Sequence, residues 1–173
     1  MAKPAKLAHF VLRTSDIDRL ADWYCSVLEA RVVHRNKMIS FATFDDEHHR
    51  IAFIDRGFKT GPESESNGVD HVAFTYENLE DLLSTYVRLR DQGIVPQRTI
   101  NHGMTTSMYY SDPDGNRIEL QVENFTDVQD AVDFMNGPIF EANPIGVLFD
   151  ADELVERFDA GVPEEELVRQ GDG

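Results

Sequence analysis

The stretch LAHFVLRTSDIDRLADWYCSVLEARVV (residues 7–33) aligns without a gap with VDHVAFTYENLEDLLSTYVRLRDQGIV (residues 69–95). The offset is 62 residues, and it places His9 on His71. Similarity of this length at a fixed offset indicates two copies of one supersecondary unit. The sequence therefore predicts a duplicated fold.

Each copy opens with a short apolar strand and continues into a helix, for which Asp16 and Asn78 are the N-cap candidates. Apolar residues recur three and four positions apart along both helices, which predicts one buried face on each. The expected members are Ile17, Leu20, Ala21, Tyr24 and Leu28, and then Leu79, Leu82, Leu83, Tyr86 and Leu89. Gly93 is expected to end the second helix. Three strands should follow each helix, at about 31–35, 38–44 and 50–54, and at about 94–98, 105–111 and 117–122.

The predicted fold class is α+β, with two βαβββ modules at about 6–56 and 68–125 that together form one domain over residues 1–125. The polar segment at 57–67 is expected to link the modules.

Residues 126–173 have no counterpart in the first copy and form a C-terminal tail. A capping-box pattern from Thr126 to Gln129 predicts a helix there. An extended Pro/Gly segment, a short amphipathic helix at about 152–158 and a fraying polar end should follow. The tail is expected to act as a strap on the sheet or an oligomer contact. The alternative is a lid that closes through Ile145, Val147 and Phe149.

Composition excludes several classes of partner. The formal net charge is −16, from 32 acidic and 16 basic residues, so nucleic acid and anionic membranes should be repelled. No apolar run approaches the roughly 20 residues that cross a bilayer, and the N-terminus lacks a signal-peptide pattern. The single cysteine, Cys25, cannot form an internal disulfide. We therefore expect a cytoplasmic protein.

The last strands of the two copies match as well, with RIAF (50–53) aligned to RIEL (117–120), although the offset has grown to 67. Ala52 therefore occupies the position of Glu119. If the two copies face a common centre, His9, His71 and Glu119 converge there. Two imidazoles and one carboxylate suit a non-haem Fe(II) facial triad, which leaves coordination positions open for substrate and oxygen.

Four motifs carry a resemblance to a known family: AHFVL (8–12), HHRIAF (48–53), DHVAF (70–74) and MYYSDPDGNRIEL (108–120). Over about residues 6–125 the sequence resembles the vicinal oxygen chelate superfamily. Within it, the sequence is most similar to the one-domain type I extradiol dioxygenases, which cleave catechols such as 2,3-dihydroxybiphenyl.

The resemblance implies that His9, His71 and Glu119 bind Fe(II), or less often Mn(II). It further implies that His49 is the acid/base residue, that Tyr109 hydrogen-bonds a catechol oxygen, and that His102 is a second histidine near the substrate. The substrates would be a small aromatic diol and molecular oxygen. Strict strand alternation from Ala52 favours His48 over His49 as the inward-facing histidine, so His48 remains the alternative.

Two other function classes are open at this point. A glyoxalase-like or epimerase-like metalloenzyme would normally need a fourth ligand at the position of Ala52, and a metal-free resistance protein would not need the triad. We expect the chain to form a homo-oligomer.

Overall fold

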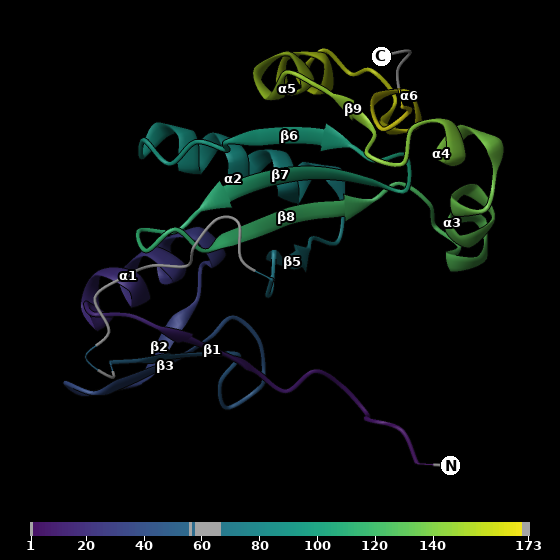
Figure 1. Cartoon of the computed structure of the whole chain (residues 1–173). Coiled ribbons are helices and arrows are strands. Elements are labelled where there is room, and N and C mark those ends of the chain that lie inside the picture. Colours follow the sequence, from purple (N-terminus) through teal and green to yellow (C-terminus); the bar gives the residue numbers. More distant parts are fainter. Residues whose placement is uncertain (1, 56, 58–66, 171–173) are drawn as a thin grey trace. The chain divides into compact units, whose positions relative to one another are not determined.

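The computed structural model describes residues 2–55, 57 and 67–170 (Figure 1). Apart from its two end residues, the predicted linker at 57–67 lies outside the described residues. The chain divides into two compact units, residues 1–68 with 112–116, and residues 69–111 with 117–173. None of the helices in the described part of the chain is long and apolar enough to cross a membrane.

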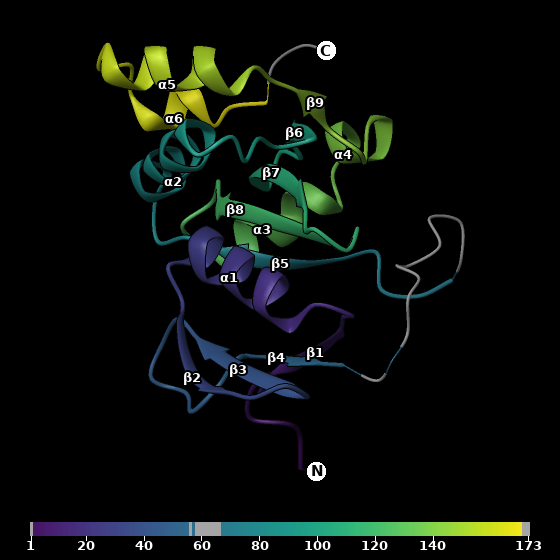
Figure 2. The ribbon, with the colours of Figure 1, turned by 90° about the vertical axis from the view of Figure 1, so that its left-hand side faces the viewer.

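The first unit contains one four-stranded sheet and one helix. Its elements are β1 (Phe10–Arg13), α1 (Ile17–Leu28), β2 (Arg31–Arg35), β3 (Ile39–Thr43) and β4 (Ile51–Ile54). The strand order is β1-β4-β3-β2, in which β1 and β4 are parallel and the other neighbours are antiparallel. Helix α1 lies on one face of this sheet (Figure 2).

The predicted start and buried face of α1 are largely confirmed. The Asp16 side chain caps the helix by accepting a hydrogen bond from the backbone N–H of Arg19. The buried residues of the helix are Ile17, Leu20, Ala21, Tyr24 and Val27. Leu28 was expected in this set but is only half-buried. The apolar face therefore ends one residue earlier than predicted.

The second unit repeats this order and adds one strand. Its first elements are β5 (His71–Thr75), α2 (Leu79–Asp91), β6 (Arg98–Asn101), β7 (Thr105–Ser111) and β8 (Arg117–Glu123). Its sheet has the order β5-β8-β7-β6-β9. Asn78 caps α2 as predicted by accepting from the N–H of Asp81, and Gly93 follows the helix with a φ of 78°. The βαβββ repeat is confirmed.

The strand predicted at about 94–98 is present, but its bounds are wrong, because β6 begins only at Arg98. The N–H of Ile94 donates to the carbonyl of Leu89 and so belongs to the end of α2. Pro96 has no N–H to offer a neighbouring strand. Pairing with β7 therefore starts where the N–H of Gln97 reaches the carbonyl of Tyr109.

The tail forms α3 (Val128–Met135), α4 (Pro138–Ala142), β9 (Val147–Leu148), α5 (Ala151–Asp159) and α6 (Glu164–Leu167). The predicted cap at Thr126 is wrong, since Asp127 accepts from the N–H of Gln129 and caps α3. Part of the extended segment becomes β9, which pairs with β6. The end was expected to fray, but residues 164–167 form α6, in which Leu167 is buried, and the last residues, 171–173, lie outside the described residues. Most of the tail's elements can be followed in Figure 1.

The strand registers make the two units equivalent residue by residue. In the first unit, Ala52 on β4 lies opposite Val11 on β1 and Phe41 on β3. In the second unit, Glu119 on β8 lies opposite Ala73 on β5 and Tyr109 on β7. The predicted equivalence of Ala52 and Glu119 is therefore confirmed, and Phe41 is the counterpart of Tyr109.

Candidate active site

In the second unit, two of the predicted metal ligands, His71 and Glu119, are in contact. His71 begins β5, and Glu119 lies in the middle of the neighbouring parallel strand β8. Nε2 of His71 is 2.9 Å from Oε2 of Glu119. The side chains meet because residues at two-residue spacing lie on the same face of a sheet, and Ala73, two residues after His71, lies directly opposite Glu119.

The other ring nitrogen of His71 is held by a carboxylate. Nδ1 is 2.8 Å from Oδ2 of Asp70. The hydrogen bond from His71 and the charge of Arg117 lower the pKa of the Asp70 carboxyl. A histidine that donates one N–H to a carboxylate directs its other nitrogen toward a metal, an arrangement common around protein-bound metals. The contact with Asp70 therefore leaves Nε2 of His71 facing Glu119, an orientation that suits a metal ligand.

Glu119 is 4% exposed, so its carboxylate has lost nearly all contact with solvent. A buried carboxylate is costly unless a positive charge or several donors compensate it. Two ligand atoms at right angles, each about 2.1 Å from a divalent metal, would be about 3.0 Å apart. The 2.9 Å between Nε2 of His71 and Oε2 of Glu119 fits that spacing. This donor pair therefore suits a divalent cation.

Tyr109 and His102 extend the cluster along β7 and the end of β6. Tyr109 lies directly opposite Glu119, and its Oη is 2.8 Å from Nε2 of His102. Burial raises the pKa of Tyr109, and the charge of Glu119 and a hydrogen bond with it raise that pKa further. Tyr109 is therefore a neutral phenol that can donate one hydrogen bond.

The first unit brings together His9 and His49. Their ring centroids are 4.4 Å apart, and the ring of His49 also lies 4.6 Å from that of Phe41. His48 is exposed, although its Nδ1 is 2.6 Å from Nδ1 of His49. Strand alternation does not govern these histidines, because β4 begins only at Ile51. Burial lowers the pKa of His49, and the neighbouring His9 and His48 lower it further.

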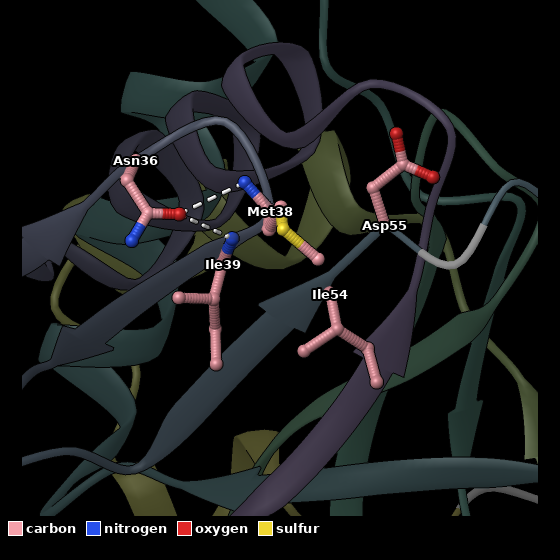
Figure 3. Close-up of a pocket in the computed structure, with 5 residues that line it drawn as sticks. All are labelled: Asn36, Met38, Ile39, Ile54 and Asp55. Atoms are coloured by element: carbon pink, nitrogen blue, oxygen red, sulfur yellow. Dashed lines mark hydrogen bonds between the residues drawn. The ribbon is translucent and has the colours of Figure 1, made fainter.

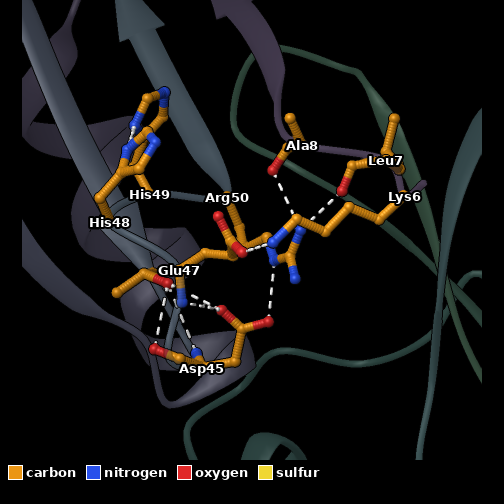
Figure 4. Close-up of polar contacts among 9 residues, drawn as sticks. Lys6, Leu7, Ala8, Asp45, Glu47, His48, His49 and Arg50 are labelled. Atoms are coloured by element: carbon orange, nitrogen blue, oxygen red, sulfur yellow. Dashed lines mark hydrogen bonds and ion pairs between the residues drawn. The ribbon is translucent and has the colours of Figure 1, made fainter. Parts of the chain in front are cut away.

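An arginine fixes the segment that leads into His9. Nη1 of Arg50 donates to the carbonyls of Leu7 and Ala8, at 2.6 and 3.1 Å, and Nε donates to Asp45 (Figure 4). In the second unit the equivalent residue, Arg117, pairs with Asp70, which directly precedes His71. Arg50 directly precedes β4 and Arg117 begins β8, so in each unit an arginine at this place contacts the residues just before the histidine.

Sequence reasoning missed the roles of Arg50, Arg117 and Asp70. A signal for the two arginines was present, since they coincide at the offset of 67 residues. Asp70 carries no such signal, because its counterpart in the first copy is Ala8.

A shallow pocket in the first unit is lined by Asn36, Met38, Ile39, Ile54 and Asp55 (Figure 3). Ile54 ends β4, whereas His49 precedes the start of that strand. The pocket offers two apolar side chains from paired strands and neither a histidine nor a nucleophile. It is therefore not a candidate for the chemistry.

The structure thus gathers the predicted site residues in two groups. His71, Glu119, Tyr109 and His102 lie together in the second unit, and His9 lies beside His49 in the first. Among the described residues, no three His, Cys, Asp or Glu side chains are placed together as a metal site. The three-ligand site stays a prediction.

Comparisons with known proteins identify one matching family and similar dioxygenases within the curated proteins. A family model described as the Glyoxalase/Bleomycin resistance protein/Dioxygenase superfamily matches residues 6–120. Biphenyl-2,3-diol 1,2-dioxygenase 2 of Rhodococcus globerulus is 43% identical over 169 residues, which are 97% of this chain and 89% of that protein. Biphenyl-2,3-diol 1,2-dioxygenase 3 of the same organism is 43% identical over 170 residues, with coverage of 97% and 90%.

A solved structure shares the fold. The glyoxylase/bleomycin resistance protein/dioxygenase domain from Frankia sp. EAN1pec matches with a TM-score of 0.58 and 22% identity. The match covers 70% of this chain and 99% of that one.

Proposed function

The chain belongs to the Glyoxalase/Bleomycin resistance protein/Dioxygenase superfamily, and we propose that it is an extradiol dioxygenase of a catechol such as 2,3-dihydroxybiphenyl. The observation that carries this proposal is the 43% identity to two biphenyl-2,3-diol 1,2-dioxygenases over 97% of the chain. The His71 and Glu119 pair supports it, because the pair offers a nitrogen and an oxygen donor at the spacing of two metal ligands.

His9, His71 and Glu119 would hold the metal, which is Fe(II) or less often Mn(II). The equivalence of His9 and His71 in the sequence repeat and the buried carboxylate of Glu119 support this set. Ala52 supports a three-ligand site rather than a four-ligand one, since the first unit offers an apolar residue where the second offers Glu119. When bound, Fe(II) would supply open coordination positions and the redox chemistry that brings a diol and O₂ to react.

The remaining residues would orient the diol and move its protons. Tyr109, neutral because burial raises its pKa, would form a hydrogen bond with one diol oxygen. His49, whose pKa is lowered by burial, is a neutral base near pH 7 that can take a hydroxyl proton and later return it. His102 would hold Tyr109 in place through their 2.8 Å hydrogen bond. The reaction breaks the ring bond beside the two hydroxyl carbons, and both oxygen atoms enter the product.

A cytoplasmic location and a homo-oligomeric state are part of the same proposal. The location is supported by the single cysteine, which cannot form an internal disulfide.

Oxygen-uptake measurements test the proposal. Anaerobically purified, Fe(II)-loaded protein should consume one O₂ for each 2,3-dihydroxybiphenyl or catechol, and with ¹⁸O₂ the ring-opened product should carry both labelled atoms. Resorcinol is the matched control, since its hydroxyls are not adjacent and cannot chelate one metal. Fully iron-loaded protein that consumes no oxygen with any vicinal diol would overturn the proposal.

A further inference from the structure

The ring of His102 is held at both nitrogens by different parts of the second unit. His102 follows the last residue of β6, and its Nε2 is 2.8 Å from the hydroxyl of Tyr109. Its Nδ1 is 2.6 Å from the backbone carbonyl oxygen of Ile145, which belongs to the tail. One residue of the core module is therefore fixed by a contact with the C-terminal tail.

This contact determines the tautomer of His102. A carbonyl oxygen can only accept a hydrogen bond, so Nδ1 of His102 must carry the proton that Ile145 accepts. In the neutral ring Nε2 is then an acceptor, and the Tyr109 hydroxyl donates to it, sharing its one proton with the nearby Glu119 carboxylate. Without the carbonyl of Ile145, nothing in this pair of contacts would prevent the opposite tautomer, in which Nε2 donates to Tyr109.

Two glycines allow the tail to approach His102 this closely. Gly146 has a φ of +96°, and a Cβ at this position would lie 2.2 Å from the carbonyl oxygen of Asn101 and 2.8 Å from Cα of His102. Gly103 has a φ of +88°, and a Cβ there would meet the ring of Phe134 from α3 at 2.2 Å. The tail therefore packs on the residues both before and after His102.

Polar contacts hold the same turn from further along the tail. The side chain of Asn143 accepts from the N–H of Gly146 at 3.1 Å and donates to its carbonyl at 2.9 Å, which shapes the loop that presents Ile145. Asn101 donates through Nδ2 to the carbonyl of Val168 at 2.8 Å. Segments near residues 134, 145 and 168 thus converge on the residues around His102.

We propose that the tail is a positioning element that fixes His102 as the Nδ1–H tautomer, so that Nε2 accepts from Tyr109. The inference rests on the proposed function for its catalytic meaning, since the Tyr109 hydroxyl is then oriented by His102 before substrate arrives. The tautomer itself is a property of the chain alone. It can be measured whether or not the chain cleaves catechols.

Nuclear magnetic resonance of the full-length, ¹⁵N-labelled chain tests the tautomer directly, at about pH 8.5, well above the ordinary histidine pKa of about 6.5. Long-range proton–nitrogen correlations distinguish the two neutral tautomers, and a His102→Gln variant identifies the His102 signals. The test variants are Gly146→Ala and the milder Asn143→Ala, which leaves the glycine in place. Gly161→Ala is the matched control, since Gly161 also lies in the tail with a φ of +80° but has nothing within 4 Å of its Cβ position.

The wild type, Gly161→Ala and Tyr109→Phe should show the Nδ1–H tautomer, because each keeps the Ile145 carbonyl in place. Gly146→Ala and Asn143→Ala should show the Nε2–H form or a mixture of the two. Their kcat should fall by about tenfold while their iron content stays unchanged. This decrease is smaller than the 10²- to 10⁴-fold decrease that the loss of a general acid typically causes. An Nε2–H wild type, or an unaltered tautomer in both test variants, would overturn the inference. An altered tautomer in a chain without dioxygenase activity would support the inference and count against the proposed function instead.

Discussion

Asp70 accepts a hydrogen bond from Nδ1 of His71, so the opposite nitrogen of the same ring faces Glu119. Asp70 thus fixes the ring of His71, the residue that would coordinate the metal in the proposed site. The pKa of Asp70 is lowered by this bond and by Arg117, so Asp70 is a carboxylate across the neutral pH range.

Replacing Asp70 should therefore weaken metal binding without removing a ligand. We expect Asp70→Ala to lower the affinity for Fe(II) by about 10- to 100-fold, as is typical when the carboxylate partner of a ligating histidine is lost. Asp70→Asn is the matched variant and should lose less, because its amide oxygen can still accept from His71. Anaerobic metal titration measures both, and equal affinity in the wild type and Asp70→Ala would show that Asp70 does not orient a ligand.

A carboxylate introduced at Ala52 should leave the metal bound but inhibit the reaction. Ala52 is the register equivalent of Glu119, so Ala52→Glu should supply a fourth oxygen donor and occupy a position that substrate or O₂ needs. Iron content should stay near the wild-type value while ring cleavage falls sharply. Circular dichroism must show a folded variant, since Ala52 is 3% exposed. A folded, iron-loaded Ala52→Glu with unchanged kinetics would refute this equivalence in function.

His49 should affect turnover and not metal content. Its ring stacks on His9, whereas His48 is exposed, so we expect His49→Ala to lower kcat by about 10² to 10⁴ and His48→Ala to remain near wild type. Steady-state kinetics at matched iron content measures the difference. A large loss of kcat in His48→Ala together with a wild-type kcat in His49→Ala would show that His48 is the acid/base residue.

Tyr109→Phe serves as a graded comparison, because it removes one hydrogen bond and keeps the ring. Its loss of turnover should be smaller than that of His49→Ala.

Acid should weaken the attachment of α5 to α2. Asp152 accepts from Arg90 at 2.6 Å and from Tyr86 at 2.9 Å, and these bonds lower its pKa below the usual 3.8. A lowered carboxyl pKa stabilises the fold above 3.8, and that contribution is lost as the pH falls through the folded-state value. The free energy of unfolding, measured by urea titration, should therefore fall less steeply below pH 4 in Asp152→Asn than in the wild type. Glu153→Gln, in the same helical turn, should follow the wild type. The prediction would be contradicted if the unfolding free energy of Asp152→Asn fell with pH as steeply as that of the wild type.

The duplication made much of this fold predictable. Because His9 and His71 coincide in a gapless alignment, and Ala52 and Glu119 coincide at a second offset, the equivalence of these positions in the two units could be predicted from the sequence. The helix caps at Asp16 and Asn78 followed from local hydrogen bonding that needs no tertiary context.

The remaining features depend on contacts that a single sequence does not encode locally. The start of β6 is decided by the end of α2 and by Pro96, and β9 exists only because β6 offers it an edge. The contact of His102 with Ile145 joins residues 43 positions apart and uses a backbone carbonyl, which has no residue signature. Alternation favoured His48 because it assumed that β4 extended to that residue.

The most direct test of the account is the iron content of Glu119→Ala beside that of Glu123→Ala after anaerobic reconstitution. Both residues lie on β8, but Glu119 is buried against His71 whereas Glu123 is exposed. We predict about one iron per chain in the wild type and in Glu123→Ala, and loss of most of it in Glu119→Ala, because a three-ligand site cannot spare its carboxylate. A Glu119→Ala chain that keeps its full iron content and activity would contradict the account.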